Sequence, residues 1–295
     1  MTVAVVVGAS SGIGRATAHA LAQRGTQLVL AARSENSLAE VAAECSSTET
    51  LIVTVDIAEE ESAAALVKAA VARFGHVDVV VNTAAVMAYG KFEDVPAHVF
   101  SRVVEVDLIG SANVARATLH QFRQQGFGTL ILVGSLLGKI AAPYMSAYIT
   151  SKWGLRGLTR ILAIETRDNA DINVCTVSPG AVDTPIYTQA ASYAGRIGRP
   201  PPPIDRPEKV ARAILRTIDH PRRKRDRSVG LANGMTELGF AAMPAVYDFL
   251  VGPLMRIAGL SRHPIEPNEG NVFEPQPRGD QLTRSGAAYD ASSRH

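Results

Sequence analysis

The stretch that decides the fold is Gly8-Ala9-Ser10-Ser11-Gly12-Ile13-Gly14. It follows a run of small and β-branched residues, 2–7, and it precedes residues 15–24, whose apolar side chains recur at helical spacing. A helix amino terminus presents unpaired N–H groups and a positive dipole, so a pyrophosphate can lie there. Glycines let the backbone turn tightly and approach such a group closely. Glycine-rich turns also close ordinary loops, but here a strand and a helix flank the turn, as phosphate binding requires.

The alternation of strand and helix continues along the chain. Further strands are predicted at 27–31, 50–55, 77–81, 129–133, 172–177 and 228–231, and helices at 35–43, 59–74, 97–125, 147–167 and 207–218. Strands and helices that alternate at this spacing form a parallel sheet with right-handed crossovers. The predicted fold class is α/β: a single doubly wound parallel sheet (Rossmann fold), with helices on both faces and a carboxy-terminal helical extension.

Composition is that of an ordinary soluble enzyme. The 295 residues are 46% hydrophobic and 20% charged, with a formal net charge of +2, which gives no reason to expect a nucleic acid partner. Cys45 and Cys175 lack CxxC spacing and are expected to be buried thiols of a reducing compartment. The chain starts with a strand-like run, so we expect no signal peptide and a cytoplasmic location. The histidines lack H-x-x-x-H spacing, so no zinc-type site is expected.

Tyr148 and Lys152 are four residues apart, on one face of the predicted helix 147–167. A phenol titrates near ~10 in water, and a neighbouring cation favours its ionised form. Lys152 is therefore expected to lower the pKa of Tyr148, the candidate general acid and base for a carbinol or carbonyl oxygen, while Ser135 donates a hydrogen bond to that oxygen. The spacing Tyr-x-x-x-Lys also arises by chance, and it gains weight because the glycine turn lies upstream, at the same carboxyl edge of the sheet.

Together these residues resemble the short-chain dehydrogenase/reductase family in its single-domain form. The likeness spans about residues 2–190 and rests on motifs in family order. It implies an oxidoreductase that interconverts a ketone and a secondary alcohol with a nicotinamide cofactor. The implied cofactor contacts are Gly8, Ser10, Ser11, Gly12, Ile13 and Gly14 at the phosphates, Asp56 and Ile57 at the adenine, Asn82 and Ala84 at the ribose, Tyr148 and Lys152 at the nicotinamide ribose, Val182 and Thr184 at the carboxamide, and the Pro179-Gly180 pair before them.

Three positions depart from the family pattern. Asn82-Thr83-Ala84-Ala85 replaces Asn-Asn-Ala-Gly, and Val7 replaces a threonine before the first glycine. Asp107 stands where the family usually has an asparagine that, by the resemblance, kinks a helix and holds a water of the proton relay behind the lysine. An ionised aspartate accepts hydrogen bonds but cannot donate them, and its charge favours protonated Lys152. We expect Asp107 to take part in catalysis, with activity retained at a shifted pH profile.

The end of the second predicted strand bears on the choice of nicotinamide cofactor. A site selective for NAD places Asp or Glu there, to bind the ribose hydroxyls. This chain has Ala31-Ala32-Arg33-Ser34 instead. The planar fork of Arg33 suits a 2′-phosphate, with Arg15 as a candidate second contact, whereas the alternative is that Arg33 is a solvated surface residue. We expect NADP(H) to be favoured over NAD(H).

The core domain is expected over residues 1–232. Within it, residues 183–206 are rich in proline and glycine and are long for a structureless connection, as many lids are. The residues expected by position to line the substrate pocket are mostly apolar and favour a hydrophobic ketone or secondary alcohol: Met87, Leu136, Leu137, Tyr144, Met145, Ile186 and Tyr187. The basic run 222–227 is interpreted as a solvated turn or as a contact for an anionic membrane surface or substrate.

Residues 233–275 form the expected carboxy-terminal extension. Apolar residues between Met235 and Leu260 recur at i+3 and i+4 and make one wide stripe. Pro244, Asp248 and Pro253 argue against a transmembrane span. Three interpretations remain open: a lid or subunit contact, packing on its own domain, or peripheral contact with a membrane interface. Residues 276–295 are predicted to be disordered, and the stretch 272–275 is a candidate to dock on the domain.

Two hypotheses follow for the whole protein. The first is the enzyme described above, as a homo-oligomer (dimer or tetramer) held by the helices at 97–125 and 147–167, as the resemblance implies. The second is a catalytically weak nucleotide-binding sensor or scaffold of the same fold, which Asp107 and the extension motivate. An intact Ser135, Tyr148 and Lys152 set speaks against the sensor, because a sensor needs no proton chemistry.

Overall fold

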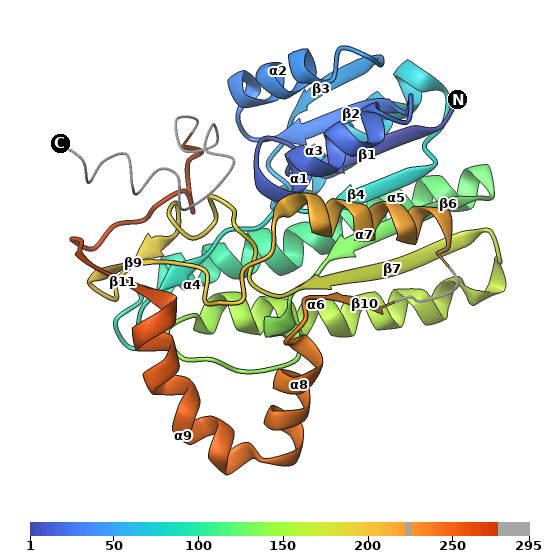
Figure 1. Ribbon diagram of the computed structural model, residues 1–295. Coiled ribbons are helices and arrows are strands. Elements are labelled where there is room, and N and C mark those ends of the chain that lie inside the picture. The colour runs from blue at the N-terminus through green and yellow to red at the C-terminus, as the bar shows by residue number, and fades with distance from the viewer. Residues whose placement is uncertain (222–225, 277–295) are drawn as a thin grey trace.

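The computed structural model describes residues 1–221 and 226–276 (Figure 1). Most of the predicted basic run and all but the first residue of the predicted disordered tail lie outside these ranges. The described elements alternate as expected and build one central sheet with helices on both sides. A second, small region at the carboxyl edge of that sheet holds the helical extension and two short strand pairs.

Seven strands form the central sheet, in the order β10-β7-β6-β4-β1-β2-β3, and all neighbours pair in parallel. Strand order reverses between β1 and β4, and such a switch point is where doubly wound sheets bind ligands. The strands are β1 (Val3–Val7), β2 (Gln27–Ala32), β3 (Thr50–Thr54), β4 (Val79–Asn82), β6 (Gly128–Val133), β7 (Ile172–Pro179) and β10 (Asp226–Val229).

Strand β1 shows why the sheet is covered on both faces. Successive side chains of a strand point to opposite faces. Ala4 and Val6 accordingly pack in one apolar cluster with α1, α2 and α7, whereas Val5 and Val7 pack in another with α3, α5 and α6. This arrangement confirms the doubly wound α/β prediction. These helices are α1 (Gly12–Ala22), α2 (Glu35–Glu44), α3 (Glu60–Phe74), α5 (Ser111–Gln125), α6 (Ser146–Glu165) and α7 (Pro207–Asp219).

The predicted single helix 97–125 is wrong in one respect. The chain instead forms α4 (Ala97–Val104), a π-helical turn (Glu105–Gly110) and then α5. A π-helical turn inserts a residue into a helix without ending it, so the apolar spacing on either side still looks helical. Asp107 lies in this π-helical turn, and its side chain is buried inside the protein.

The carboxy-terminal extension is two helices rather than one continuous stripe. They are α8 (Asn233–Ala242) and α9 (Pro244–Leu254), and the break falls at Pro244, which lacks the N–H that a helix interior needs. Figure 1 shows the two helices as a hairpin that projects from the lower side of the molecule. A π-helical turn (Met255–Gly259) follows α9. No helix in the described ranges is long and apolar enough to cross a membrane.

The predicted lid segment contains ordered structure. Strand β8 (Ala191–Ser192) pairs with β5 (Ala88–Tyr89), and β9 (Arg196–Gly198) pairs with β11 (Leu260–Pro264), the strand after α9. The segment is therefore tied at one place to the core and at another to the carboxy-terminal extension.

Candidate active site

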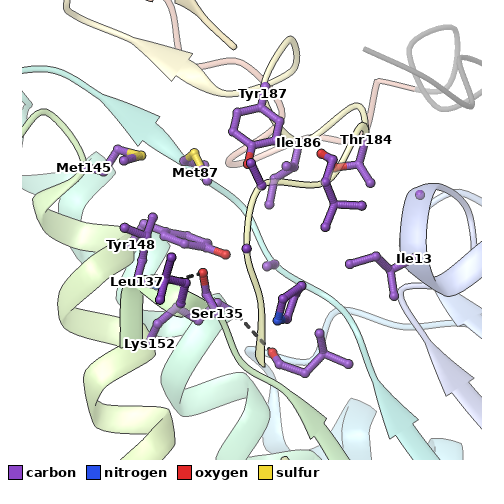
Figure 2. Close-up of a pocket in the computed structure, with 18 of the residues that line it drawn as sticks. Ile13, Met87, Ser135, Leu137, Met145, Tyr148, Lys152, Thr184, Ile186 and Tyr187 are labelled. Carbon is purple, nitrogen blue, oxygen red and sulfur yellow. Dashed lines mark hydrogen bonds between the residues drawn. The ribbon is translucent and has the colours of Figure 1, made fainter. Parts of the chain in front are cut away.

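A cavity of about 680 Å³ opens at the carboxyl ends of the central strands. Its walls come from the glycine turn before α1, the ends of β2, β4, β6 and β7, the first turns of α6, and the helices α8 and α9. Figure 2 shows the oxygens of Ser135 and Tyr148 directed into this space, with Ile13 and Thr184 across it. The two halves of the predicted site therefore face one cavity.

The glycine turn is packed so closely that side chains would not fit. Gly8 and Gly12 have φ of 79° and 51°, values that side-chain-bearing residues rarely adopt. A Cβ at Gly14 would lie 2.0 Å from the Gly8 carbonyl oxygen. Helix α1 begins at Gly12, and the first N–H groups of a helix have no partner within it. The turn therefore leaves room and donors for a phosphate, and the whole predicted set of Gly8, Ser10, Ser11, Gly12, Ile13 and Gly14 lines the cavity.

Thr83 holds this turn in place, a role that the sequence did not reveal. Its hydroxyl donates to the Val7 carbonyl at 2.7 Å and lies 3.3 Å from the Gly8 carbonyl. In the sequence, Thr83 stands out only as a departure from the family pattern. A hydroxyl directly after a strand that neighbours the glycine turn is the signal that could have indicated the contact.

Ser135, Tyr148 and Lys152 come together as predicted. Helix α6 begins at Ser146, so Tyr148 and Lys152 lie one turn apart, with the Lys152 Nζ 5.3 Å from the centroid of the Tyr148 ring. Ser135 follows β6, and its Oγ accepts a hydrogen bond of 3.1 Å from the Leu137 N–H. All three side chains line the cavity. The arrangement can hold an oxygen atom between two hydroxyls and transfer a proton to or from it.

The expected lowering of the Tyr148 pKa is not found. Burial raises its pKa above the usual range, the charges of Asp107 and Tyr187 raise it further, and the hydrogen bond with Ser135 opposes them. The physical reason is the burial of Tyr148 itself; Lys152 is also buried, which lowers the pKa of its ammonium, and it faces the carboxylate of Asp107. Without a cofactor, the Tyr148 phenol is therefore neutral.

Asp107 lies behind Lys152 and does not line the cavity. Its Oδ1 accepts a hydrogen bond of 2.8 Å from the Val86 N–H, and its Oδ2 lies 3.9 Å from the Lys152 Nζ. Burial raises the pKa of Asp107 to about 6, against the opposing effects of Lys152 and the Val86 N–H. Within the described residues its Oδ2 has no hydrogen-bond partner. Asp107 is therefore placed to act through Lys152, not on a substrate.

Of the residues expected to contact the ribose and the adenine, three line the cavity and one does not. Ala84, Asp56 and Ile57 line the cavity, whereas Asn82 lies beneath it and donates to the Ser111 Oγ at 3.0 Å. The Asp56 carboxylate is engaged by the Arg102 guanidinium and by the Ala58 N–H. The Asn82 Oδ1 accepts a hydrogen bond of 3.1 Å from the Ala84 N–H. Asn82 therefore shapes the cavity wall by holding Ala84. The opposite wall contains the predicted set Pro179, Gly180, Val182 and Thr184.

The two arginines expected near a 2′-phosphate differ in position. Arg33 lines the cavity, and its guanidinium donates to the carbonyls of Asn271, Val272 and Phe273. It is therefore not a freely solvated surface residue. Arg15 points instead to Glu44, with its Nε 2.9 Å from the Glu44 Oε2, and it does not line the cavity. The expectation that Arg15 is a second contact is wrong, because α1 turns its side chain toward α2.

Six of the seven predicted substrate-pocket residues line the cavity; Tyr144 does not. Tyr144 adopts φ of 73°, and its hydroxyl accepts a hydrogen bond of 2.7 Å from the Arg256 Nε, outside the cavity lining. Helices α8 and α9 supply one wall of the cavity, and their apolar stripe in the sequence indicates a contact but not which surface it covers. The residues of this wall are Met235, Thr236, Gly239, Met243, Val246, Tyr247, Leu250, Val251 and Leu254.

Neither cysteine belongs to the site. Cys45 and Cys175 are both buried, which confirms their expected burial. Burial raises the pKa of Cys45 to about 11, so its thiol is unreactive at neutral pH. Among residues 1–221 and 226–276, no three histidine, cysteine or acidic side chains are grouped to hold a metal ion.

Comparison with known proteins identifies the family. A family profile described as short chain dehydrogenase matches residues 2–193. The chain belongs to this family. An uncharacterised oxidoreductase of Bacillus subtilis (strain 168), YxnA, is 34% identical over 280 residues, 92% of this chain and 77% of that protein. A cis-4-hydroxycyclohexanecarboxylate dehydrogenase of Sinomonas cyclohexanicum is 36% identical over 222 residues, 72% of this chain and 87% of that protein.

Solved structures of this family share the fold. An alcohol dehydrogenase from the archaeon Thermococcus sibiricus, complexed with 5-hydroxy-NADP, superposes with a TM-score of 0.66 at 32% identity and covers 78% of this chain and 95% of that one. This short-chain dehydrogenase is therefore an oxidoreductase that acts between CH–OH and C=O groups with NAD(P). The glycine turn, with the space and N–H donors that a phosphate needs, fits that cofactor.

Proposed function

We propose that this short-chain dehydrogenase interconverts an apolar ketone and its secondary alcohol and prefers NADP(H) to NAD(H). The observation that supports this most strongly is the convergence of Ser135, Tyr148 and Lys152 on a cavity that apolar side chains of the substrate end also line. A bound nicotinamide supplies or accepts the hydride. The residues Ser10 to Gly14, Ala84, Val182 and Thr184 would hold the cofactor, since they line the same cavity as Tyr148.

The proton chemistry falls to Tyr148. A neutral phenol is a proton donor, so the raised pKa of Tyr148 suits donation to the oxygen of a ketone; in the reverse direction the phenolate takes the proton from the alcohol. Ser135 holds the same oxygen by a hydrogen bond. Lys152, about one helical turn away, stabilises the phenolate when it forms.

Two observations support the preference for NADP(H). No carboxylate stands at the end of β2, where a site selective for NAD needs one, and Arg33 brings a cation to the cavity there. The related archaeal alcohol dehydrogenase was crystallised with an NADP derivative. Steady-state kinetics with NADPH and NADH on one ketone test the preference, and a higher kcat/KM with NADH would contradict it.

The apolar lining supports a hydrophobic substrate. Met87, Leu137 and Met145 line the cavity near Tyr148, and Leu250 and Leu254 line it as well. The Sinomonas relative is named for a cyclohexane alcohol that also carries a carboxylate, so its name agrees with a carbocyclic ring in the substrate. A ketone panel of graded hydrophobicity should give kcat/KM values that rise with apolar surface. Values that rise with the number of hydroxyl groups would favour a sugar instead.

We also propose a cytoplasmic homo-oligomer. Trp153, Ile161 and Ile164 of α6 are partly to half exposed, and an apolar helix face of this kind is typical of a subunit contact. The two buried thiols, which form no disulfide with each other, agree with a reducing compartment. The hairpin α8–α9, with residues 183–206, is proposed as the lid over the substrate, because its inner side lines the cavity. Flotation of the full chain with liposomes tests peripheral membrane contact as the alternative use of this hairpin.

The second candidate is a sensor that binds the cofactor without turnover. The observation that favours it is the buried carboxylate of Asp107 facing Lys152, at a position where the family pattern has asparagine. Carbonyl substrates followed at the absorbance of the reduced cofactor separate the two. Turnover no faster than that of Tyr148→Phe on every substrate would favour the sensor.

A further inference from the structure

After strand β11, the chain runs back to the end of the cavity beside β2, where the cofactor is proposed to bind. Residues 268–276, here called the carboxy-terminal strap, follow β11 and end beside the tip of β2. Asn271, Pro275 and Gln276 line the same cavity as Arg33. The family profile ends at residue 193, so the strap lies outside the part of the chain that defines the family.

The strap is anchored along the segment 189–192. The backbones of Ser192 and Asn268 exchange two hydrogen bonds, of 2.9 and 3.1 Å. The Asn271 N–H donates to the Gln189 carbonyl at 2.8 Å, and the two side chains meet at 3.0 Å. Val272 is fully buried in the apolar cluster that also contains Tyr148. These contacts make the strap an ordered part of the cavity wall.

Gly270 shows how close this approach is. Its φ is 52°, and a Cβ there would lie 2.2 Å from the Gln189 carbonyl oxygen. Any side chain at this position must displace the strap from residues 189–191 or distort both. Gly270 is therefore the point at which one substitution can loosen the strap without touching Arg33.

On its other side, the strap is held by hydrogen bonds from Arg33. Its guanidinium donates to the carbonyls of Asn271 at 2.6 Å, Val272 at 3.2 Å and Phe273 at 3.1 Å. A guanidinium has five N–H donors in a fixed plane, so a ligand that uses the fork in a bidentate manner must take over donors that the strap now holds. Neutral carbonyls form weaker bonds to a guanidinium than phosphate oxygens do. A phosphate can therefore displace the strap, whereas a neutral hydroxyl cannot.

We propose that the carboxy-terminal strap competes with the 2′-phosphate of NADP(H) for Arg33 and thereby sets how far the enzyme prefers NADP(H). The inference rests on the proposed preference for NADP(H). NADP(H) binding releases residues 271–273 from Arg33, while NAD(H), which lacks the 2′-phosphate, binds with the strap in place. The strap lowers the apparent affinity for NADP(H) by the fraction of molecules in which it is open.

Hydrogen exchange of the wild-type chain is the first test. Amides of residues 268–276 should exchange faster with saturating NADP⁺ than without cofactor, and at an unchanged rate with saturating NAD⁺. Exchange that is slower or unchanged with bound NADP⁺ would overturn the strap proposal alone, because the strap would then close over the cofactor or ignore it. No binding of NADP⁺ at any concentration that saturates NAD⁺ would overturn the proposed cofactor preference as well.

Binding of the variant Gly270→Val, measured by calorimetry, is the second test. An open strap in about one wild-type molecule in ten would make this variant bind NADP⁺ about tenfold more tightly than wild type, with NAD⁺ affinity unchanged. Gly75→Val is the matched control, since Gly75 also has a positive φ, of 83°, but a Cβ there meets nothing within 4 Å. If Gly270→Val, but not Gly75→Val, bound NADP⁺ and NAD⁺ more weakly by the same factor, the strap would be a structural support of the site. That result would contradict the proposal.

Discussion

The carboxylate of Asp107 lies 3.9 Å from the ammonium of Lys152, and the two side chains are only 0% and 3% exposed. Burial disfavours both charges, so it raises the pKa of Asp107 to about 6 and lowers the pKa of Lys152. Both groups of the pair therefore titrate closer to neutral pH than they would in water. Because Lys152 lies beside the ring of Tyr148, the protonation of this pair controls the field at the catalytic phenol.

The buried Asp107 should make stability depend on pH. Its pKa is raised from 3.8 to about 6, so the folded chain holds a proton that the unfolded chain releases between these values. The free energy of unfolding of wild type should therefore fall as pH rises through this window, relative to Asp107→Asn. Urea denaturation of both proteins at several pH values measures the difference. A difference that is constant with pH would contradict the raised pKa.

The same substitution should alter the pH profile of the reaction. Asp107→Asn removes a carboxylate whose charge raises the pKa of Tyr148 and that of Lys152. The limb of the kcat/KM profile that reports Tyr148 should accordingly move to lower pH. Profiles of kcat/KM against pH for the two proteins make the comparison, and superimposable curves would refute a role for the charge.

The glycine turn should tolerate no methyl group at Gly14. The built Cβ lies 2.0 Å from the Gly8 carbonyl oxygen, so Gly14→Ala must spread the turn that holds the phosphates. We expect cofactor affinity to fall by about tenfold or more, on the order of 1.4 kcal/mol. Gly157→Ala in α6 is the control, because a Cβ there meets nothing within 4 Å. Equal cofactor affinities of the two variants, measured by titration, would show that the turn is not the phosphate site.

The exposed apolar face of α6 should hold the oligomer together. Ile161 and Ile164 are 53% and 47% exposed, and replacing both by glutamate places charge in the proposed contact. The molar mass from light scattering should then drop to that of a smaller assembly. Phe249→Glu on α9, where the side chain is 79% exposed, is the comparison. A drop in mass only for Phe249→Glu would place the contact on the hairpin α8–α9 instead.

The sheet and the meeting of Tyr148 with Lys152 at the cavity could be predicted because each depends on local spacing. Alternating strands and helices indicate the doubly wound sheet, and four-residue spacing brings Tyr148 and Lys152 to one face of α6. The order of the motifs along the chain then places them at one edge of that sheet. No long-range contact has to be known for these steps.

What could not be predicted depends on contacts between distant residues. The bonds from Arg33 to residues 271–273 join positions about 240 apart in sequence, and no spacing indicates them. The direction of the Tyr148 pKa shift depends first on how deeply Tyr148 is buried and then on the charge of Asp107, which only the packed structure shows. The π-helical turn at Asp107 keeps the apolar period of its neighbours, so it is hidden in the sequence.

The central claim is that the Tyr148 hydroxyl transfers the proton in a reaction carried out in the cavity. The most direct measurement is kcat/KM of wild type and Tyr148→Phe on the best ketone of a panel, with NADP⁺ affinity measured for both. We expect kcat/KM to fall by about 10²- to 10⁴-fold with little change in NADP⁺ affinity, because the phenyl ring still fits but carries no proton. Equal kcat/KM values for the two proteins would contradict the account.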